Sequence, residues 1–135
     1  MENLRKIVKD TIESGKEDDV SSVALGLLEV SGKTLSNGYV IRAQHRITLG
    51  IPDITVEILH NKIPLIVIEC KSKNASMSVG ESQIIAYMVD GNYPHGILMS
   101  PSKVKYYHME EIPEIIRTFF LSEDISRIVE LLRDL

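Results

Sequence analysis

Apolar and polar residues alternate along two short runs in the middle of the chain. Every second position is apolar in residues 53–59 and again in residues 65–71. Because successive side chains of a strand point to opposite faces, each run predicts a strand with one apolar face and one mixed face. The segment between them contains Asn61 and Pro64, which favour a turn. The pattern therefore predicts a β-hairpin over residues 52–71.

The length of the turn decides which polar side chains share a face of this hairpin. With an odd number of turn residues, position 53 lies opposite 71 and position 55 opposite 69, so that Asp53, Glu69 and Lys71 lie on one face. A two-residue turn would place the carboxylates on opposite faces. The apolar positions of the two strands align only in the first case. The sequence thus predicts an odd turn or a bulge.

The rest of the chain alternates between helical and strand-like patterns. Acidic residues open one helix, an apolar stripe marks the last one, and Ser-Pro-Ser at 100–102 favours a turn between strands. The predicted order, ααβββαββαα, indicates an α/β protein in which residues 1–135 form a single domain. Helices are predicted over residues 2–14, 17–30, 79–90, 111–121 and 123–134, and further strands over residues 39–49, 95–99 and 104–109.

Two carboxylates and one amine stand at the ends of the hairpin strands. Asp53 follows Pro52 before the first apolar run, while Glu69 and Lys71 close the second. Mg²⁺ prefers oxygen ligands and keeps several waters, so two carboxylates and the phosphate oxygens of a substrate make a suitable site. The metal would stabilise charge on the attacked phosphate, and Lys71 would orient water or neutralise that phosphate. We expect Asp53 and Glu69 to bind Mg²⁺, with Mn²⁺ as a substitute.

Pro52-Asp53 followed by Glu69-Cys70-Lys71 resembles the motif of the PD-(D/E)xK nuclease superfamily. The order of predicted elements is similar to the core of that family over most of the chain. The resemblance implies a restriction-endonuclease-like fold, with a central mixed sheet of about five strands flanked by helices. It also implies metal-dependent DNA hydrolysis, in which Asp53, Glu69 and Lys71 are catalytic.

Gln83 and Tyr87 are four positions apart and therefore lie on one side of the predicted helix over residues 79–90. They resemble the Gln-x-x-x-Tyr element that follows the catalytic strand in one branch of these nucleases, which includes exonucleases and the restriction subunits of type I systems. The resemblance implies that both residues lie near the active site and contact substrate or support the lysine. Lys73 is a further candidate for substrate binding.

The resembled family also carries an acidic residue on a helix before the first core strand. Glu17, Glu13 and Glu29 are the candidates in this chain. Glu17 opens the predicted helix over residues 17–30 and best matches the placement in the family. We expect Glu17 to be the outer acid of the site, with Glu13 and Glu29 as alternatives.

The charge balance argues against a protein that coats nucleic acid. With 15 Lys and Arg against 19 Asp and Glu, the formal net charge is -4, whereas histone-like binders rely on many phosphate contacts. An enzyme that binds DNA briefly can instead concentrate its cations locally. Candidates for such a basic rim are the pairs Arg42 and Arg46, Lys71 and Lys73, and Lys103 and Lys105.

Cysteine and histidine positions suggest no second chemistry. One Cys excludes an intramolecular disulfide and agrees with a reducing compartment. Cys70 falls on the apolar face of its strand and is expected to be a small buried residue. With no signal peptide or spanning segment recognisable, the expected location is the cytoplasm. The histidines, which show no metal-ligand spacing, are His45, His60, His95 and His108.

The sequence therefore favours a Mg²⁺-dependent DNA endonuclease of restriction or of DNA repair and recombination. A Holliday junction resolvase is one alternative. Another is a non-catalytic nucleic-acid-binding or assembly subunit that keeps the fold. The expected partners are DNA, a second copy of the chain in a homodimer, and a separate specificity or motor subunit. The apolar face of the helix over residues 123–134 either forms the dimer surface or packs on the core.

Overall fold

Six strands in the order β1-β2-β3-β4-β5-β6 form one mixed sheet, in which β3 and β4 are the only parallel pair. The structure is a computed structural model that describes residues 1–135. The strands are β1 (Tyr39–Ala43), β2 (Ile54–Ile58), β3 (Pro64–Cys70), β4 (His95–Met99), β5 (Lys103–Met109) and β6 (Pro113–Phe120). The helices are α1 (Glu2–Ser14), α2 (Glu17–Val30), α3 (Met77–Gly91) and α4 (Ile125–Asp134), with a short 3-10 helix, η1 (Leu35–Asn37).

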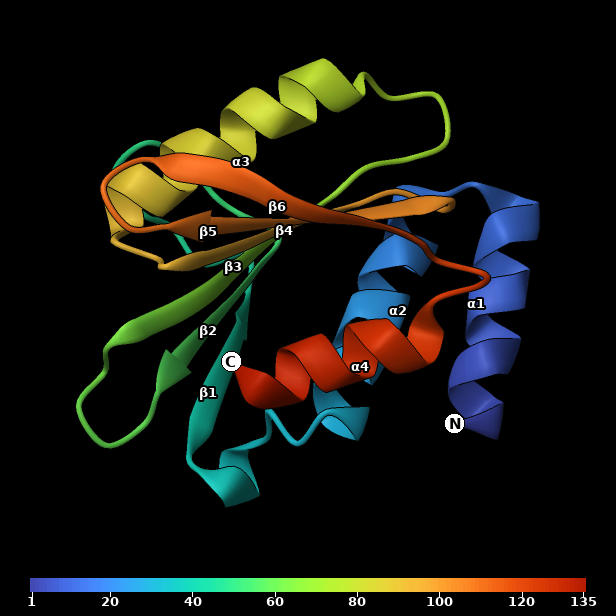
Figure 1. Cartoon of the computed structure of the whole chain (residues 1–135), viewed down its shortest axis with the longest axis horizontal. Helices are drawn as coiled ribbons and strands as arrows, with labels where there is room; N and C mark the ends of the chain where they lie inside the picture. The colour runs from blue at the N-terminus through green and yellow to red at the C-terminus, as the bar shows by residue number, and fades with distance from the viewer.

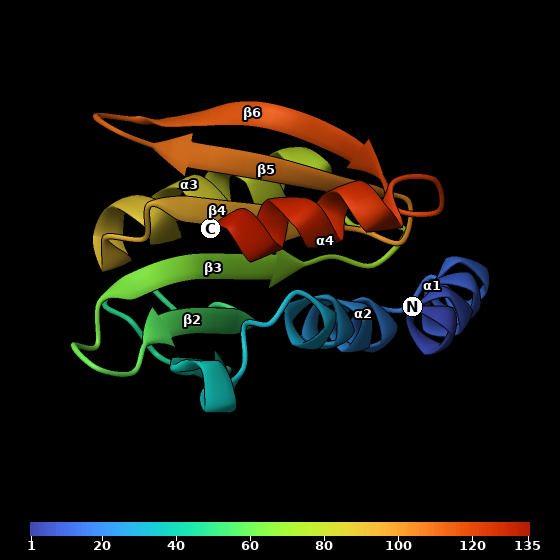
Figure 2. The same ribbon diagram turned by 60° about the horizontal axis from the view of Figure 1, so that its bottom comes forward.

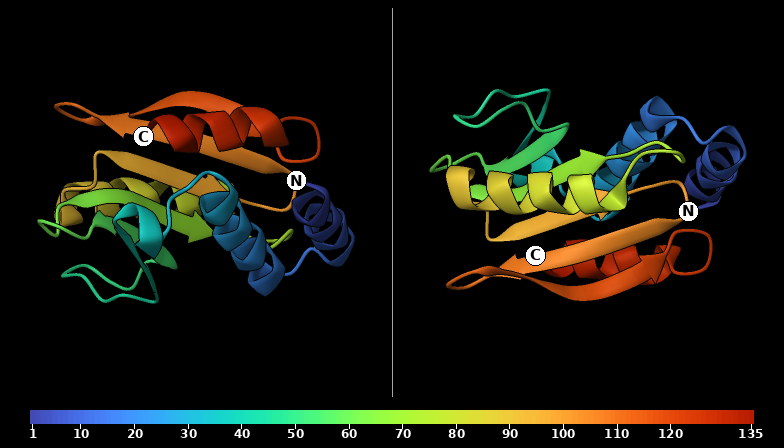
Figure 3. Two further views of the ribbon diagram at one scale, coloured as in Figure 1. Left: turned by 90° about the horizontal axis from the view of Figure 1, so that it is seen from below. Right: turned by 90° about the horizontal axis from the view of Figure 1, so that it is seen from above.

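The helices lie on both faces of the sheet (Figure 1). Helix α3 covers one face alone, and α2 and α4 cover the other, with α1 packed against α2 (Figure 3). Helix α4 lies over β4 and β5 in the tilted view (Figure 2). The larger core cluster joins α1, α2 and α4 to the sheet, and a smaller cluster around Val67, Ile84 and Tyr107 fills the space beneath α3. This layering confirms the predicted α/β class.

The prediction of a helix over residues 111–121 is wrong. Residues Pro113–Phe120 form β6, which pairs antiparallel with β5 and makes the sheet six-stranded. The segment is rich in Ile, Thr and Phe, which suit a pleated surface better than a helix. Pairing with the edge of β5 therefore decides the conformation of this segment. The observed order is ααβββαβββα.

The first strand is shorter than the predicted range of 39–49. It ends at Ala43 because Gln44 adopts a left-handed conformation, with φ at 55°. The chain then forms a loop that returns to β2, closed by an isolated bridge between Ile47 and Gly50. Helix α3 starts at Met77, two residues before the predicted start, since the hydroxyl of Ser76 caps it by accepting the Val79 N–H.

A bulge sets the register of the β2–β3 hairpin. Near the turn Glu57 pairs with Pro64, whereas beyond the bulge at Val56/Glu57 the pairs are Val56 with Ile66 and Ile54 with Ile68. Continued by one position, this register places Asp53 beside Glu69. The predicted partner of Asp53, Lys71, is therefore wrong by two residues. The predicted shared face of Asp53, Glu69 and Lys71 holds, because a shift of two keeps the alternation of side chains.

Helix α4 does not offer the apolar dimer surface that the sequence suggested. Its apolar stripe is buried in the larger core, so it takes the second of the two predicted roles. The buried stripe consists of Ile125, Ile128, Val129 and Leu132.

No helix of the structure has both the length and the apolar character needed to cross a membrane.

Candidate active site

Asp53 stands just before β2 and is fixed by hydrogen bonds from two neighbouring segments. Its Oδ2 accepts the backbone N–H of Cys70 at 2.7 Å, and its Oδ1 accepts from Nε2 of Gln44 at 3.2 Å. The backbone N–H of Gln44 also donates to the carbonyl of Asp53 at 2.9 Å. The carboxylate is thus oriented by the end of β3 on one side and by Gln44, the residue after β1, on the other.

Glu69 lies beside Asp53 and is buried, with 5% of its surface exposed. Its Oε1 accepts the backbone N–H of Asp53 at 3.3 Å. Burial raises the pKa of Glu69 to about 8, a hydrogen bond with the Asp53 carboxyl and the Asp53 charge act in the same direction, and Lys71 opposes them. Two adjacent carboxyl groups in a dry site favour holding a proton or a cation between them.

Lys71 completes this group from the residue after β3. Its Nζ lies 3.8 Å from Oε2 of Glu69, and only 14% of its side chain is exposed. The stem runs past Gly80 of α3, where an added Cβ would lie 3.3 Å from Lys71 Cε and 2.8 Å from Leu98 Cδ1. Glycine at this position therefore allows α3 to approach the sheet closely enough to hold the lysine.

The donor set fits a divalent cation that prefers oxygen. Asp53 and Glu69 supply carboxylate oxygens, and the structure contains no group of three or more His, Cys, Asp or Glu side chains that would enclose a metal. Mg²⁺ accepts such an open site, since it retains waters and binds substrate phosphates. Oε1 of Gln83, on α3, is buried without a hydrogen-bond partner.

Tyr87 of α3 lies near this site, and Gln83 stands one helical turn before it. Tyr87 is 8% exposed, and burial raises its pKa, with further contributions from the charges of Glu69 and Asp53. An added Cβ at Gly50 would lie 3.2 Å from the Tyr87 hydroxyl, so the loop before β2 packs against this ring. Both residues line a groove of about 590 Å³ together with Leu49, Ser78, Val79, Ser82 and Ala86.

The three candidates for the outer acid lie in different places. The exposed Glu17 opens α2, and its charge contributes to raising the pKa of Cys70. The same end of β3 is tied to the turn before α2, because the N–H of Lys73 donates to the carbonyl of Gly15 at 2.9 Å. Glu13 lines a different pocket, between α1 and α4. Of the three, Glu17 is the one in electrostatic contact with the end of β3.

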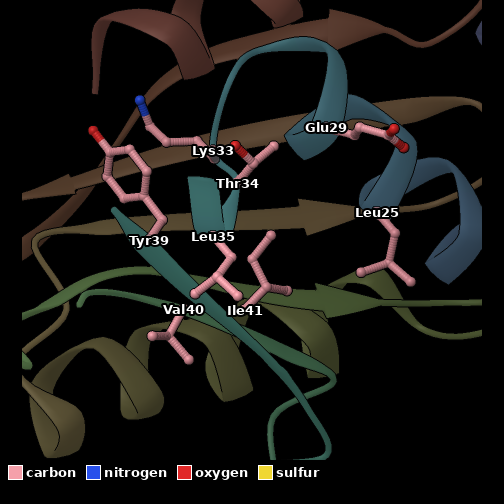
Figure 4. Close-up of a pocket in the computed structure, with 8 residues that line it drawn as sticks. All are labelled: Leu25, Glu29, Lys33, Thr34, Leu35, Tyr39, Val40 and Ile41. Atoms are coloured by element: carbon pink, nitrogen blue, oxygen red, sulfur yellow. The ribbon is translucent and has the colours of Figure 1, made fainter. Parts of the chain in front are cut away.

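Glu29 stands at the opposite end of α2 and belongs to another surface. It lines a pocket of about 440 Å³ beside β1, with Lys33 and Tyr39 at the other side of the pocket (Figure 4). Lys33 Nζ donates to the carbonyl of Arg133 and lies 4.9 Å from the centre of the Tyr39 ring. These contacts anchor the C-terminal end of α4 and do not involve the carboxylate pair.

Cys70 is buried, as its place on the apolar face of its strand predicts, and two of the four histidines stack on each other. Burial raises the pKa of the Cys70 thiol to about 12; a contact with Ser21 acts in the opposite direction, and nearby carboxylates add to the increase. His95 stacks on His108 and bonds to the Tyr106 hydroxyl at 2.7 Å. Burial lowers the pKa of His95 to about 4, with smaller effects from His108 and Lys33. His95 opens β4, away from Glu69.

The structure also adds one residue that the sequence pattern did not indicate. Gln44 was included in a predicted strand, whereas its left-handed backbone is what turns its amide toward Asp53. Three cations of the predicted basic rim are already paired, Lys71 with Glu69 and two others. Arg42 donates to Glu57 at 2.9 Å, and Lys105 Nζ lies 3.9 Å from the Glu81 carboxylate.

No family model matches the chain, and no curated protein matches it in sequence. Three solved structures share its fold. The type IIG restriction endonuclease BpuSI matches 85% of this chain with a TM-score of 0.59 and 18% identity, over 15% of its own length. The DrdV–DNA complex matches 98% with a TM-score of 0.63 and 13% identity, over 14% of its own chain.

The third is a fragment of a putative HsdR subunit of a type I restriction enzyme from Vibrio vulnificus YJ016. It matches 89% of this chain with a TM-score of 0.57 and 16% identity, over 26% of its own length. The fold is therefore restriction-endonuclease-like. The chain spans about 14 to 26% of the length of these solved chains.

Proposed function

We propose that this protein is a metal-dependent nuclease that hydrolyses phosphodiester bonds in DNA. The observation that carries the proposal is the pair of the half-buried Asp53 and the buried Glu69, with Lys71 beside it, at the end of a hairpin in a restriction-endonuclease-like fold. Glu69, whose pKa burial raises to about 8, is poised to exchange a proton for a divalent cation held together with the neighbouring Asp53. Gln83 and Tyr87 on the adjacent helix support membership of the PD-(D/E)xK branch that has the Gln-x-x-x-Tyr element.

Each residue of the site has a distinct role in this proposal. Asp53 and Glu69 hold Mg²⁺ or Mn²⁺, which supplies charge stabilisation and an acidified water when bound. Lys71, whose stem packs against α3 at Gly80, neutralises the attacked phosphate or orients the nucleophile. Gln83, Tyr87 and Lys73 position the substrate, and Glu17 acts as the outer acid. Catalysis in this scheme is mostly positioning and electrostatics, since the chain offers no nucleophilic side chain at the site.

A cleavage assay tests the proposal. Purified protein with Mg²⁺ or Mn²⁺ is expected to cut DNA, and Asp53→Ala or Lys71→Ala is expected to abolish cutting. Glu111→Gln, on the exposed β5–β6 turn, serves as a matched control and is expected to retain it. Cleavage that survives both site substitutions would overturn the assignment.

The DNA form and the partners belong to the same proposal. Restriction-like endonuclease action is favoured, because the solved structures of the same fold are restriction enzymes and a DNA complex. A panel of linear duplex, single strand and four-way junction separates this from a junction resolvase. Equal cutting of all three forms would argue against a resolvase. Calorimetry that detects no Mn²⁺ binding, even with DNA present, would instead favour a non-catalytic binding or assembly subunit.

A homodimer would need a surface other than α4. Exposed large apolar side chains gather on and beside the edge strand β6, at Ile112, Ile115, Ile116 and Phe120. We place self-association, or contact with a separate specificity or motor subunit, at this edge. Sedimentation of the parent and of Ile116→Lys tests it, since a charge at a central β6 position is expected to shift a dimer to monomer.

A further inference from the structure

A second polar pocket, separate from the carboxylate pair, opens where the parallel strands β3 and β4 end. Cys70 pairs with Met99, and the N–H of Lys71 donates to the Met99 carbonyl at 2.8 Å. The segments that follow, residues 71–75 and 100–103, therefore leave the sheet side by side. The crevice beyond the carboxyl ends of adjacent parallel strands is a common place for ligands in α/β proteins.

This pocket has a volume of about 390 Å³, and its wall combines amines and hydroxyls with four apolar residues, Ile12, Ala75, Met77 and Pro101. Two lysines, Lys73 and Lys103, and three serines, Ser72, Ser100 and Ser102, contribute to its wall. No Asp or Glu is among the lining residues. In a protein with a formal net charge of -4, a pocket that gathers only positive charge is a local exception.

The two lysines are free of ion pairs, whereas three other cations on or next to the strands are paired. Lys71, Lys105 and Arg42 each lie within 4 Å of a carboxylate. Neither Lys73 nor Lys103 has a carboxylate within this distance, so their charges are available to a ligand. An unpaired cation keeps more of its attraction for an anion than one that is already neutralised.

The backbone around the pocket is held in place before any ligand arrives. The stem of Lys73 lies against Gly15, where an added Cβ would be 2.9 Å from Lys73 Cβ, and its N–H donates to the Gly15 carbonyl. Ser100 is 7% exposed, and its hydroxyl accepts the Lys103 N–H at 3.1 Å. Met77, the first residue of α3, also lines the pocket, so the positive end of that helix dipole lies there.

From this arrangement we propose that the pocket binds a phosphate group, namely a backbone phosphate of the nucleic acid next to the one that is cleaved. Ammonium and hydroxyl donors without carboxylates suit a tetrahedral oxyanion and disfavour cations. Lys73 is two residues from Lys71, which brings the pocket to the border of the proposed catalytic site. That the phosphate belongs to DNA rests on the proposed function, whereas binding of phosphate itself does not.

The first experiment measures phosphate binding without any catalysis. Inorganic phosphate is titrated into the full chain, and backbone amide shifts are followed by NMR. The expected result is saturable shifts at residues 72–73 and 100–103, which are lost in the double variant Lys73→Gln, Lys103→Gln. Lys62→Asn is the control for the loss of an exposed lysine outside the pocket, because Lys62 lies at the far turn of the hairpin with φ at 57°, a value that Asn tolerates. Absence of localised shifts in the parent overturns the proposal, whether or not the protein cuts DNA.

The second experiment asks whether the phosphate is part of DNA. Duplex binding is measured with Ca²⁺ at several salt concentrations, so that cleavage does not interfere. The double variant is expected to bind several-fold more weakly, with a salt slope smaller by about 1, as for the loss of one phosphate contact. An unchanged slope, next to intact binding of inorganic phosphate by the parent, overturns the assignment to DNA and leaves a site for free phosphate. A parent that binds DNA but never cuts it contradicts the nuclease proposal alone.

Discussion

The backbone N–H of Asp53 donates to the carboxylate of Glu69, and the carboxylate of Asp53 in turn accepts the N–H of Cys70, the residue after Glu69. This reciprocal contact fixes both acids with main-chain bonds rather than with long side chains. It keeps two carboxyl groups together at a place where one of them is buried. The two carboxyl groups repel each other when both are charged, and a bound cation would reduce this repulsion.

The buried glutamate makes the stability of the metal-free protein dependent on pH. The folded-state pKa of Glu69 is raised from 4.5 to about 8, so the folded state holds a proton that the unfolded state releases. The stabilisation from that proton is greatest below pH 4.5 and is lost as the pH rises toward 8. Urea unfolding in EDTA is expected to show falling stability between pH 5 and pH 8, by up to about 1.4 kcal/mol per pH unit.

Glu69→Gln removes this dependence and is expected to be more stable than the parent at pH 8. Glu111→Gln, an exposed glutamate, serves as the control and is expected to follow the parent curve. Added Mg²⁺ should flatten the parent profile, because a bound cation takes the place of the proton. Parallel profiles for the parent and Glu69→Gln would show that the carboxylate is not strained in the folded state.

Substitution of Lys71 is expected to lower the cleavage rate without weakening metal binding, unlike substitution of the two carboxylates. Asp53→Asn and Glu69→Gln each remove a charged ligand and should weaken Mn²⁺ binding at least about tenfold, in line with the loss of one metal-ligand charge. Lys71→Met keeps the stem beside Gly80 and should leave Mn²⁺ affinity intact or improved, while cleavage falls by about 10² to 10³. Calorimetry and a cleavage time course measure the two effects. Loss of Mn²⁺ binding in Lys71→Met would assign the lysine a structural role instead.

The hairpin that carries the site was predictable because its information is local. Alternation in β2 and β3 identified both strands, and the demand that their apolar faces align placed Asp53, Glu69 and Lys71 together. The exact partner was not predictable, since it depends on where the bulge lies, and no residue pattern places it at Val56/Glu57. A shift of two residues keeps each side chain on the same face of the sheet, but it changes the residue with which each one pairs.

Two other segments show where local information fails. Residues 113–120 form a strand because β5 offers a free edge, and that edge is known only once the sheet is assembled. The sequence predicts a strand that continues past Ala43, because Gln44 has no turn signature. In the structure the backbone of Gln44 is left-handed and ends the strand. The phosphate pocket likewise joins segments almost thirty residues apart, Ser72 and Ser100 among them, that only the parallel pairing of β3 and β4 brings together.

Gly80 is expected to be required for the position of Lys71. A methyl group at this position meets Leu98, which is fully buried, at 2.8 Å, and Lys71 Cε at 3.3 Å. Gly80→Ala should therefore destabilise the protein by about 1 kcal/mol, despite the higher helix propensity of alanine. It should also lower the cleavage rate more than it lowers DNA affinity.

Gly26→Ala is the matched control for this substitution. Gly26 also lies within a helix, but its added methyl group would approach the flexible ends of Leu4 and Ile7, at 3.2 and 3.3 Å. Urea unfolding should find this variant as stable as the parent or more stable, by up to about 1 kcal/mol. A Gly80→Ala protein with parental stability and cleavage would show that α3 is free to shift and that glycine does not set the lysine.

Gln44 is expected to orient Asp53 through its side chain and not through its backbone conformation. Gln44→Gly keeps the left-handed turn at φ 55° but removes the amide that donates to Asp53 Oδ1. The variant should fold at least as stably as the parent, because glycine adopts this φ without strain. Its affinity for Mn²⁺ should fall by about three- to tenfold, the effect of losing one hydrogen bond to a charged ligand.

Gln44→Ala separates the two contributions, since alanine loses the amide and also carries the strain of a positive φ. It should match Gln44→Gly in Mn²⁺ affinity and be less stable by about 1 kcal/mol. Calorimetric titration with Mn²⁺ and urea unfolding of both variants give the comparison. If Gln44→Gly binds Mn²⁺ as tightly as the parent, the contact at Asp53 Oδ1 does not orient the ligand, and the N–H of Cys70 is then what orients the Asp53 carboxylate.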